Sequence, residues 1–234
     1  MLILGLQKLT LLDYPGLVAC TIFTAGCNFH CPFCHNASLV RAGSKPGGID
    51  ESEVFRFLEM RRGLLDGVVL SGGEPLLQDD LERVLKKIRS MGFQVKLDTN
   101  GSRPDKLKSL VEKGLVDYAA MDIKNAPELY PVTTGTAGVD LDAVRRSKDF
   151  LISGKIPYEF RTTAVKGLHT EESLVEAARF IEGAKAYYLQ RYSDQGEILQ
   201  PEGLSAFSDE EMHRILRDVQ TVIPEAKLRG MENE

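Results

Sequence analysis

The sequence predicts an α/β fold with parallel strands, and three observations support this. Short apolar runs alternate with amphipathic segments, residues of unusual chemistry follow the apolar runs, and 234 residues suffice for one sizeable domain. Successive strands joined by a helix pair in parallel through right-handed crossovers, which gives a doubly wound sheet or a barrel-like curl. We therefore expect one domain over residues 1–234.

Six runs rich in apolar and β-branched residues are the predicted strands. They cover residues 18–24, 67–70, 94–98, 118–123, 158–163 and 186–190. Six segments with apolar residues at helical spacing are the predicted helices. They include residues 54–58, 81–88, 107–111, 141–151, 174–181 and 212–219.

Residues that favour helix ends flank several of these segments. Asp50 with Glu53, and Ser208 with Glu211, have the spacing of a capping box, so we expect helices to begin there. Residues 132–138 are rich in Thr and Gly and are predicted to form a loop.

Composition and charge narrow the classes of function. The chain has 29 basic and 34 acidic residues, a formal charge of −5, and is 43% hydrophobic, which excludes a disordered or collagen-like chain. The acidic balance disfavours a general nucleic-acid binder. No apolar run is long enough to span a bilayer, and residues 1–12 lack the pattern of a signal peptide. We expect a cytoplasmic protein without nucleic-acid or membrane partners.

The chemically unusual residues follow the predicted strands. In parallel α/β folds the carboxyl ends of the strands share one edge, where ligands bind. The residues that follow successive strands are Cys27, Ser71 to Pro75, Asp98 to Gly101, Asp122 with Lys124, Thr163 with Lys166, and Arg191 with Tyr192. The sequence therefore predicts a functional site at this edge.

Three of the four cysteines form a C-x3-C-x2-C cluster at Cys27, Cys31 and Cys34, while Cys20 lies inside an apolar run and is predicted to be buried. A structural zinc site normally has four protein ligands, and His35 offers a fourth only awkwardly. An iron–sulfur cluster held by three cysteines would leave one iron open to a small molecule. The spacing favours the cluster, with zinc or metal-free cysteines as alternatives.

This spacing, with Phe33 at its aromatic position, resembles the signature of the radical S-adenosylmethionine (SAM) superfamily. The resemblance implies that Cys27, Cys31 and Cys34 ligate a [4Fe-4S] cluster whose remaining iron is chelated by the amino and carboxylate groups of SAM. It also implies a curled, incomplete (β/α)6 TIM-like barrel, in agreement with the six strand–helix units.

Other residues at the same edge suit this ligand. Gly72, Gly73 and Glu74 form a glycine-rich turn, and in the superfamily such a motif contacts the methionine amino group. Asp122 and Lys124 are two residues apart on one strand and face the same side. Closely placed carboxylates need a cation to offset their repulsion.

The resemblance narrows to the activating enzymes of glycyl-radical enzymes, of the anaerobic ribonucleoside-triphosphate reductase and pyruvate formate-lyase types. It is carried by the sequences CHN at 34–36, GGEP at 72–75, LDTNG at 97–101 and MDIK at 121–124. It implies that Lys124 binds the SAM carboxylate, and that a monovalent cation could be held beside it by Asp98, Thr99, Met121 and Asp122. Tyr192 stands where the pyruvate formate-lyase activator has a SAM-contacting His, which favours a reductase-type partner.

By this resemblance the protein is a radical SAM oxidoreductase that cleaves SAM reductively and takes a hydrogen atom from a glycine of a partner, such as an anaerobic ribonucleotide reductase. A flavodoxin or ferredoxin would supply the electron, and no residue of this chain need act as nucleophile or general base. Two alternatives remain open: a radical SAM enzyme acting on a small molecule or nucleotide, and a noncatalytic zinc or electron-transfer protein.

Overall fold

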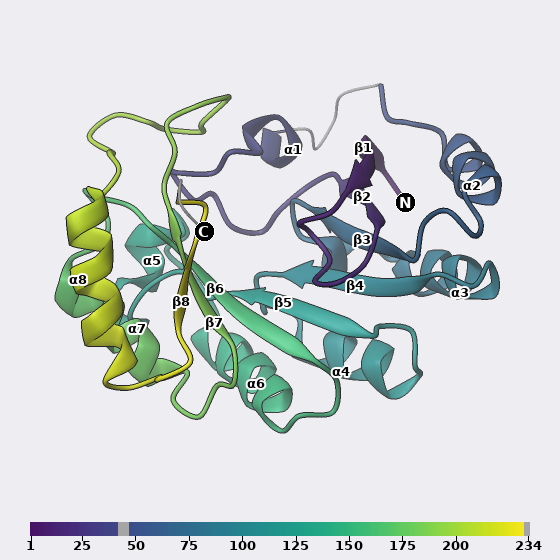
Figure 1. Ribbon diagram of the computed structural model, residues 1–234. Coiled ribbons are helices and arrows are strands. Elements are labelled where there is room, and N and C mark those ends of the chain that lie inside the picture. Colours follow the sequence, from purple (N-terminus) through teal and green to yellow (C-terminus); the bar gives the residue numbers. More distant parts are fainter. Residues whose placement is uncertain (42–46, 232–234) are drawn as a thin grey trace.

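The computed structural model describes residues 1–41 and 47–231. Its eight strands form one sheet in the order β1 to β8 (Figure 1). β1 is antiparallel to β2, and every other neighbouring pair is parallel. The strands are β1 (Ile3–Thr10), β2 (Ala19–Thr24), β3 (Gly67–Gly72), β4 (Gln94–Thr99), β5 (Tyr118–Asp122), β6 (Tyr158–Ala164), β7 (Tyr187–Arg191) and β8 (Lys227–Arg229).

The six predicted strands are confirmed as β2 to β7, and the curled α/β fold is confirmed with them. The sheet extends by one strand at each edge, and neither β1 nor β8 was predicted. In β1 the consecutive residues Gln7, Lys8 and Leu9 are exposed, so the period of two that marks a half-buried strand is lost. β8 has three residues and is too short to give a pattern.

The six predicted helices are also confirmed, and they lie along the outer side of the curled sheet (Figure 1). They are α2 (Glu51–Met60), α3 (Leu81–Ser90), α4 (Pro104–Glu112), α6 (Leu141–Ile152), α7 (Glu171–Phe180) and α8 (Asp209–Gln220). Short helices that the sequence did not predict are α1 (Ala37–Arg41), α5 (Tyr130–Thr133) and the 3-10 turns η1 (Pro75–Leu77) and η2 (Pro127–Leu129). The predicted loop at 132–138 is therefore wrong at its first two residues, which end α5.

The two capping predictions have different outcomes. Ser208 and Glu211 form the reciprocal capping box at the start of α8. At α2 the Asp50 carboxylate accepts from the backbone N–H of Ser52, so the helix begins where expected but without the predicted box to Glu53. Local residue chemistry fixed the helix start in both cases.

Successive side chains of a strand point to opposite faces of the sheet, and this decides which of them reach the site. On β4, Val95 and Leu97 are fully buried in the main hydrophobic cluster, while the alternate residues Lys96 and Asp98 belong to an ion-paired network. β6 follows the same rule, with Phe160 in the hydrophobic cluster and Arg161 in the charged network. Apolar residues on one side of the sheet therefore pack against the helices, and charged residues occupy the other.

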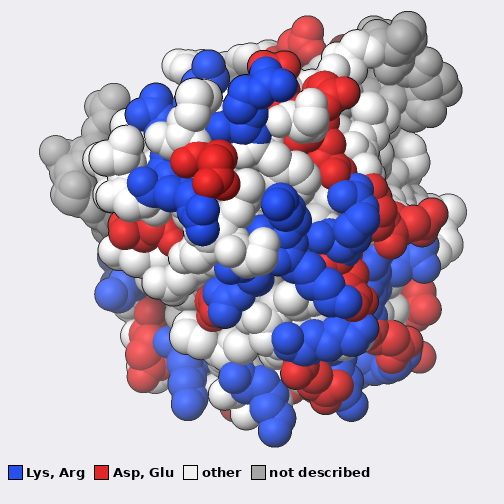
Figure 2. Space-filling model, turned by 90° about the vertical axis from the view of Figure 1, so that its right-hand side faces the viewer, with Lys and Arg blue, Asp and Glu red and all other residues white. Residues whose placement is uncertain are grey.

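The side of the molecule on the right of Figure 1 carries interleaved basic and acidic side chains (Figure 2). Charged side chains also pair along the helices: Lys86 of α3 and Lys113 both pair with Glu82, and Arg83 pairs with Glu51. None of the helices formed by residues 1–41 and 47–231 has the length and apolar character needed to cross a membrane.

Candidate functional site

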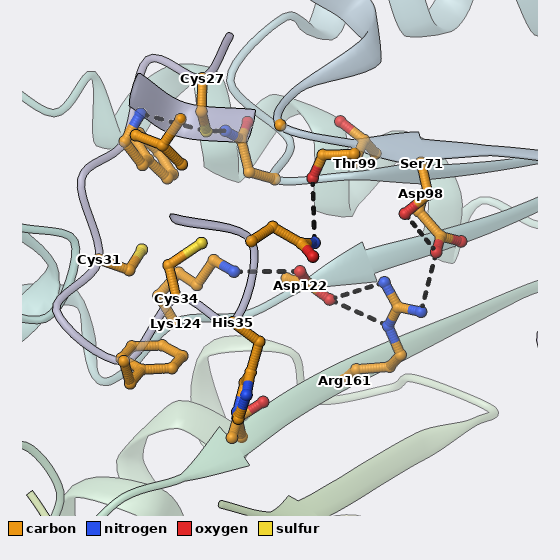
Figure 3. Close-up of a pocket in the computed structure, with 18 of the residues that line it drawn as sticks. Cys27, Cys31, Cys34, His35, Ser71, Asp98, Thr99, Asp122, Lys124 and Arg161 are labelled. Carbon is orange, nitrogen blue, oxygen red and sulfur yellow. Dashed lines mark hydrogen bonds and ion pairs between the residues drawn. The ribbon is translucent and has the colours of Figure 1, made fainter. Parts of the chain in front are cut away.

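A pocket of about 280 Å³ opens at the carboxyl ends of the strands (Figure 3). Its wall is made by the loop after β2 and by the last residues of β3 to β7. The lining residues are Cys27, Phe29, Cys31, Phe33, Cys34, His35, Asn36, Val40, Ser71, Gly72, Gly73, Asp98, Thr99, Asn100, Asp122, Lys124, Arg161, Thr163 and Gln190. The predicted position of the site, at the edge shared by the strand ends, is thus where the cavity lies.

The loop that carries the three cysteines, residues 25–36, is anchored by segments far away in the chain. His30 N–H donates to the carbonyl of Thr134, at 2.8 Å. Two backbone N–H groups of the β7–α8 connection donate to this loop, Leu199 to Cys34 at 3.2 Å and Gln200 to Pro32 at 2.9 Å. Three side chains from one irregular loop can therefore face one cavity (Figure 3).

Burial keeps two of these thiols protonated in the metal-free protein. It raises the pKa of Cys27 to about 12, although the backbone N–H of Phe29 donates to its sulfur at 3.4 Å. Burial likewise raises the pKa of Cys31 to about 11, and the Lys124 ammonium opposes this shift. Binding of a metal centre would have to displace these protons. Over the described ranges, no three His, Cys, Asp or Glu side chains are grouped closely enough to hold a single metal ion, whereas the irons of a cluster would each bind a different cysteine.

The glycine-rich turn after β3 supports the cysteine loop. A Cβ on Gly73 would lie 1.9 Å from the carbonyl oxygen of Gly26, the residue before Cys27. Gly72 has φ +120°, and a Cβ there would lie 2.3 Å from the backbone N of Thr24. These two positions need glycine because backbone packs on backbone at the junction between β3 and the cysteine loop.

Glu74 lies beneath this junction and not on the pocket wall. Its fully buried carboxylate accepts from the Thr99 hydroxyl at 2.8 Å, the Asn100 N–H at 2.7 Å and the Leu76 N–H at 3.1 Å. Burial raises the pKa of Glu74 to about 7, and the three donors oppose the shift. In this geometry Glu74 connects the ends of β3 and β4, and the contact of its side chain with a ligand stays a prediction.

A row of charged side chains crosses the pocket from β4 to β6 (Figure 3). The Arg161 guanidinium donates to Asp98 at 3.2 Å and to Asp122 at 2.9 Å. Lys96 and Lys124 complete the row, the first donating to Asp98 at 2.6 Å and the second to Asp122 at 3.0 Å. We call these five residues the charged row.

Mutual pairing keeps the charged row ionised despite its burial. Burial alone would raise the pKa of Asp122, but Arg161 and Lys124 outweigh it and lower the pKa to about 2. The pKa of Asp98 is also lowered, because Arg161 and Lys96 outweigh burial. For Lys124 burial acts against the charged form, yet Asp122 and the Cys31 sulfur raise its pKa. The row therefore presents fixed charges to the pocket.

His169, to which the sequence assigned no role, holds the backbone beside Lys124. Its Nε2 lies 2.8 Å from the Lys124 carbonyl and its Nδ1 lies 3.2 Å from the Val165 N–H. Burial lowers the pKa of His169, so the ring is neutral with its proton on Nε2. Its ring centroid is 6.4 Å from that of Phe33, and the Lys124 ammonium is 5.9 Å from the same ring.

Most of the predicted site residues come together, and three do not line the pocket. Met121 is fully buried and packs beneath Gly101. The Tyr192 ring packs 5.7 Å from that of His35, and within the described part of the chain its buried hydroxyl has no hydrogen-bond partner. Glu74 is the third. Those that line the pocket are Cys27, Cys31, Phe33, Cys34, Gly72, Gly73, Asp98, Thr99, Asp122 and Lys124.

The sequence did not identify Arg161. It lies in the middle of a strand, and only its register opposite Asp122 on the neighbouring strand reveals its place. A basic residue within an otherwise buried strand is a usable signal, since unpaired charges are rarely buried. Arg161 occupies the position between the two carboxylates where a monovalent cation was expected.

Comparisons with known proteins agree with this architecture. Residues 21–181 match the family model described as the radical SAM superfamily. A protein of Methanocaldococcus jannaschii named "Putative glycyl-radical enzyme activating enzyme MJ1227" is 30% identical over 195 residues, 82% of this chain and 80% of the relative. A "Probable GTP 3',8-cyclase" of Thermococcus kodakarensis is 29% identical over 150 residues, 64% of this chain and 48% of the relative.

Solved structures share the fold at low identity. SuiB of Streptococcus suis bound to S-adenosylmethionine has a TM-score of 0.68 and 14% identity, covering 89% of this chain and 49% of SuiB. Native anSMEcpe with bound AdoMet has a TM-score of 0.61 and 16% identity, covering 88% of this chain and 62% of that one. These likenesses concern the fold alone. The family model matches well over half of this chain, and the chain therefore belongs to the radical SAM superfamily. Enzymes of this superfamily use a [4Fe-4S] cluster and S-adenosylmethionine.

Proposed function

We propose that this protein activates a glycyl-radical enzyme, by reductive cleavage of SAM followed by removal of a hydrogen atom from a glycine of the partner. The relative of M. jannaschii carries this proposal, because its alignment covers four fifths of both chains and its name states this activity. An anaerobic ribonucleoside-triphosphate reductase is the partner we favour, with a flavodoxin or ferredoxin as electron donor.

In this proposal Cys27, Cys31 and Cys34 hold three irons of the cluster. The cluster, when bound, supplies the electron that breaks a carbon–sulfur bond of SAM and leaves methionine and a 5′-deoxyadenosyl radical. All three side chains line the same pocket as Lys124 (Figure 3).

One feature of the pocket fits the amino-acid end of SAM. The charged row has three cationic and two anionic side chains, so it attracts a carboxylate, and Lys124 is the cation nearest the cysteines. Tyr192 does not line the pocket itself; its ring packs against His35, which does, and its buried hydroxyl has no hydrogen-bond partner among the described residues. Its contact with SAM stays a prediction.

The chain's own residues have positioning roles in this reaction. Backbone and side-chain contacts hold the cysteine loop against β3, and the charged row orients the bound amino acid. A fixed orientation matters because a radical formed in a poorly ordered site would react with solvent or with the protein itself. The hydrogen transfer needs no acid or base from this chain.

An isotope experiment tests the proposal. The anaerobically reconstituted protein is reduced with SAM and an anaerobic ribonucleotide reductase whose glycines carry deuterium at the α-carbon. We expect deuterium in 5′-deoxyadenosine and a glycyl-radical signal on the reductase, and neither when the radical-bearing glycine is replaced by alanine. Cleavage of SAM without deuterium transfer would contradict the proposed partner.

Similarity to GTP cyclases favours a second candidate, a radical SAM enzyme that acts on a nucleotide. The similarity covers 48% of that relative, against 80% for the activating-enzyme relative. Replacing the reductase with GTP in the same assay distinguishes them. Deuterium transfer from GTP labelled on the ribose would support the second candidate over the first.

A further inference from the structure

We propose that Arg161 is the cation of this site, a built-in guanidinium that makes SAM binding independent of metal cations between Asp98 and Asp122. The inference rests on the proposed binding of SAM in this pocket, and not on the identity of the partner. It assigns a positioning role to a residue that the signature motifs do not include.

The two carboxylates repel each other, and a cation between them would offset this repulsion. Asp98 and Asp122 come from adjacent parallel strands and both face the pocket. Carboxylates this close raise each other's pKa unless positive charge lies between them. A bound monovalent ion is one solution, and a side chain of the protein is the other.

The oxygens that a metal ion would need already accept hydrogen bonds from the protein. On Asp98, Oδ1 accepts from Lys96, and Oδ2 accepts from Arg161 and from the Ser71 hydroxyl. On Asp122, Oδ1 accepts from Arg161 and Oδ2 accepts from Lys124. All four oxygens therefore have donors, and a metal ion between the two carboxylates would be repelled by the three cationic side chains that already pair with them.

Arg161 is held in the geometry that such a bridge requires. It lies directly opposite Asp122 in the register between β5 and β6, and its side chain is 15% exposed. Its Nε and Nη2 both lie 2.9 Å from Oδ1 of Asp122, while Nη1 reaches Asp98. The planar guanidinium can pair with two carboxylates at once, which a lysine ammonium does less specifically.

The charge balance gives this arrangement a consequence for the ligand. Three cationic side chains face two carboxylates, so one positive charge remains before any ligand binds. A ligand carboxylate neutralises it. If Arg161 were absent the row would be neutral, and a bound cation would be needed to restore the attraction.

Binding of labelled SAM to the reconstituted protein by equilibrium dialysis tests this inference. We expect the dissociation constant to be equal, to within about twofold, in potassium, sodium and tetramethylammonium chloride at the same ionic strength. Binding at least about fivefold tighter in potassium or sodium would contradict it, since screening alone does not distinguish these ions.

The variant Arg161→Met should behave differently. In tetramethylammonium its affinity for SAM should fall about tenfold or more, the usual effect of losing one charge-assisted interaction, and potassium or sodium should restore part of the loss. Wild-type affinity in this variant without metal cations would overturn the inference.

Two further variants keep the test decisive. Arg214→Met removes the partner of another carboxylate, Glu171, on the surface and away from the pocket lining, and should leave SAM affinity unchanged. Arg161→Lys keeps the charge and should bind SAM more weakly than wild type without becoming dependent on metal cations. Dependence of Arg161→Lys on potassium or sodium equal to that of Arg161→Met would contradict the role of charge.

These results are separable from the proposed function. A wild-type protein that binds SAM equally in all three salts but never labels 5′-deoxyadenosine from a glycine would refute the partner and leave Arg161 as the site's cation. A wild-type protein that binds no SAM would refute both.

Discussion

The cysteine loop and the charged row form opposite walls of one pocket, yet they are built in different ways. Cys27, Cys31 and Cys34 lie on an irregular loop, and burial keeps the thiols of the first two protonated without metal. Four residues of the charged row lie on the adjacent strands β4, β5 and β6, Lys124 follows β5, and each carboxylate is already paired. One wall depends on a cofactor to complete it, and the other is preformed.

This difference separates the roles of the two walls. Strands fix side-chain positions through the ladder of the sheet, so the charged row can orient a ligand before the cluster is present. The loop depends on a few long-range backbone contacts and on whatever its thiols bind. Changes in the loop should therefore abolish chemistry, while changes in the row should weaken binding.

The largest effect is expected for Cys31→Ala. The variant should lose the iron–sulfur absorption and SAM cleavage entirely, because two thiolates do not hold the cluster. Its circular dichroism should match that of wild type. The control Cys20→Ala removes a buried cysteine outside the pocket and should retain cluster and cleavage. Turnover by Cys31→Ala would contradict the assignment of the ligands.

The junction between β3 and the cysteine loop is sensitive at Gly73. The change Gly73→Ala places a Cβ against the Gly26 carbonyl and should lower the free energy of unfolding by about 3 kcal/mol, the upper end for overpacking. Urea unfolding measures it, and iron content after reconstitution should fall as well. Gly138→Ala is the control, because a Cβ there has open space and φ is not positive. Equal stability of the two variants would refute the packing argument.

Lys124→Met tests the preformed wall alone. Loss of a charge-assisted contact to the SAM carboxylate costs about 1.5–3 kcal/mol, so affinity should fall roughly 10- to 100-fold. Iron content should stay at the wild-type level, which separates this variant from those of the loop. Lys87→Met, on the exposed face of α3, should not change affinity. Loss of the cluster in Lys124→Met would mean that the walls are not independent.

The prediction with the smallest effect on the site's chemistry concerns pH and Glu74. The pKa of this carboxyl is raised from 4.5 to about 7, so between these values the folded protein binds the extra proton. Stability from this group is therefore present below about pH 4.5 and is lost as pH rises through 7. The shift, in which the three donors already oppose burial, corresponds to a loss on the order of 3 kcal/mol.

Chemical unfolding at several pH values measures this slope. Glu74→Gln, which cannot ionise, should lack it, while Glu176→Gln on the surface of α7 should keep it. A wild-type slope of opposite sign, or an unchanged slope in Glu74→Gln, would contradict the shifted pKa.

The sequence revealed the two walls unequally, for physical reasons. The cysteines share one short segment, so their spacing alone indicated a cluster and the edge of the sheet where it lies. Asp98, Asp122 and Lys124 follow strands and could be placed by the alternation of side chains. Arg161 could not, because its partners come from other strands and only the register brings them together.

The edge strands of the sheet and the direction of the Glu74 side chain were not predicted, for related reasons. β1 has consecutive exposed residues and β8 is very short, so neither shows the pattern of a strand. Glu74 belongs to a motif whose glycines do line the pocket, but its own carboxylate turns into the protein. Which way one side chain of a turn points depends on the neighbouring strand, here the end of β4.

Electron–nuclear double resonance on the reduced, reconstituted protein tests the central claim most directly. SAM is added with 17O in its carboxylate and 15N in its amino group. A cluster that Cys27, Cys31 and Cys34 would hold, with one iron left without a cysteine, predicts magnetic coupling of both labels to the cluster. A cluster that shows coupling to neither label, with SAM bound at saturation, would contradict the account.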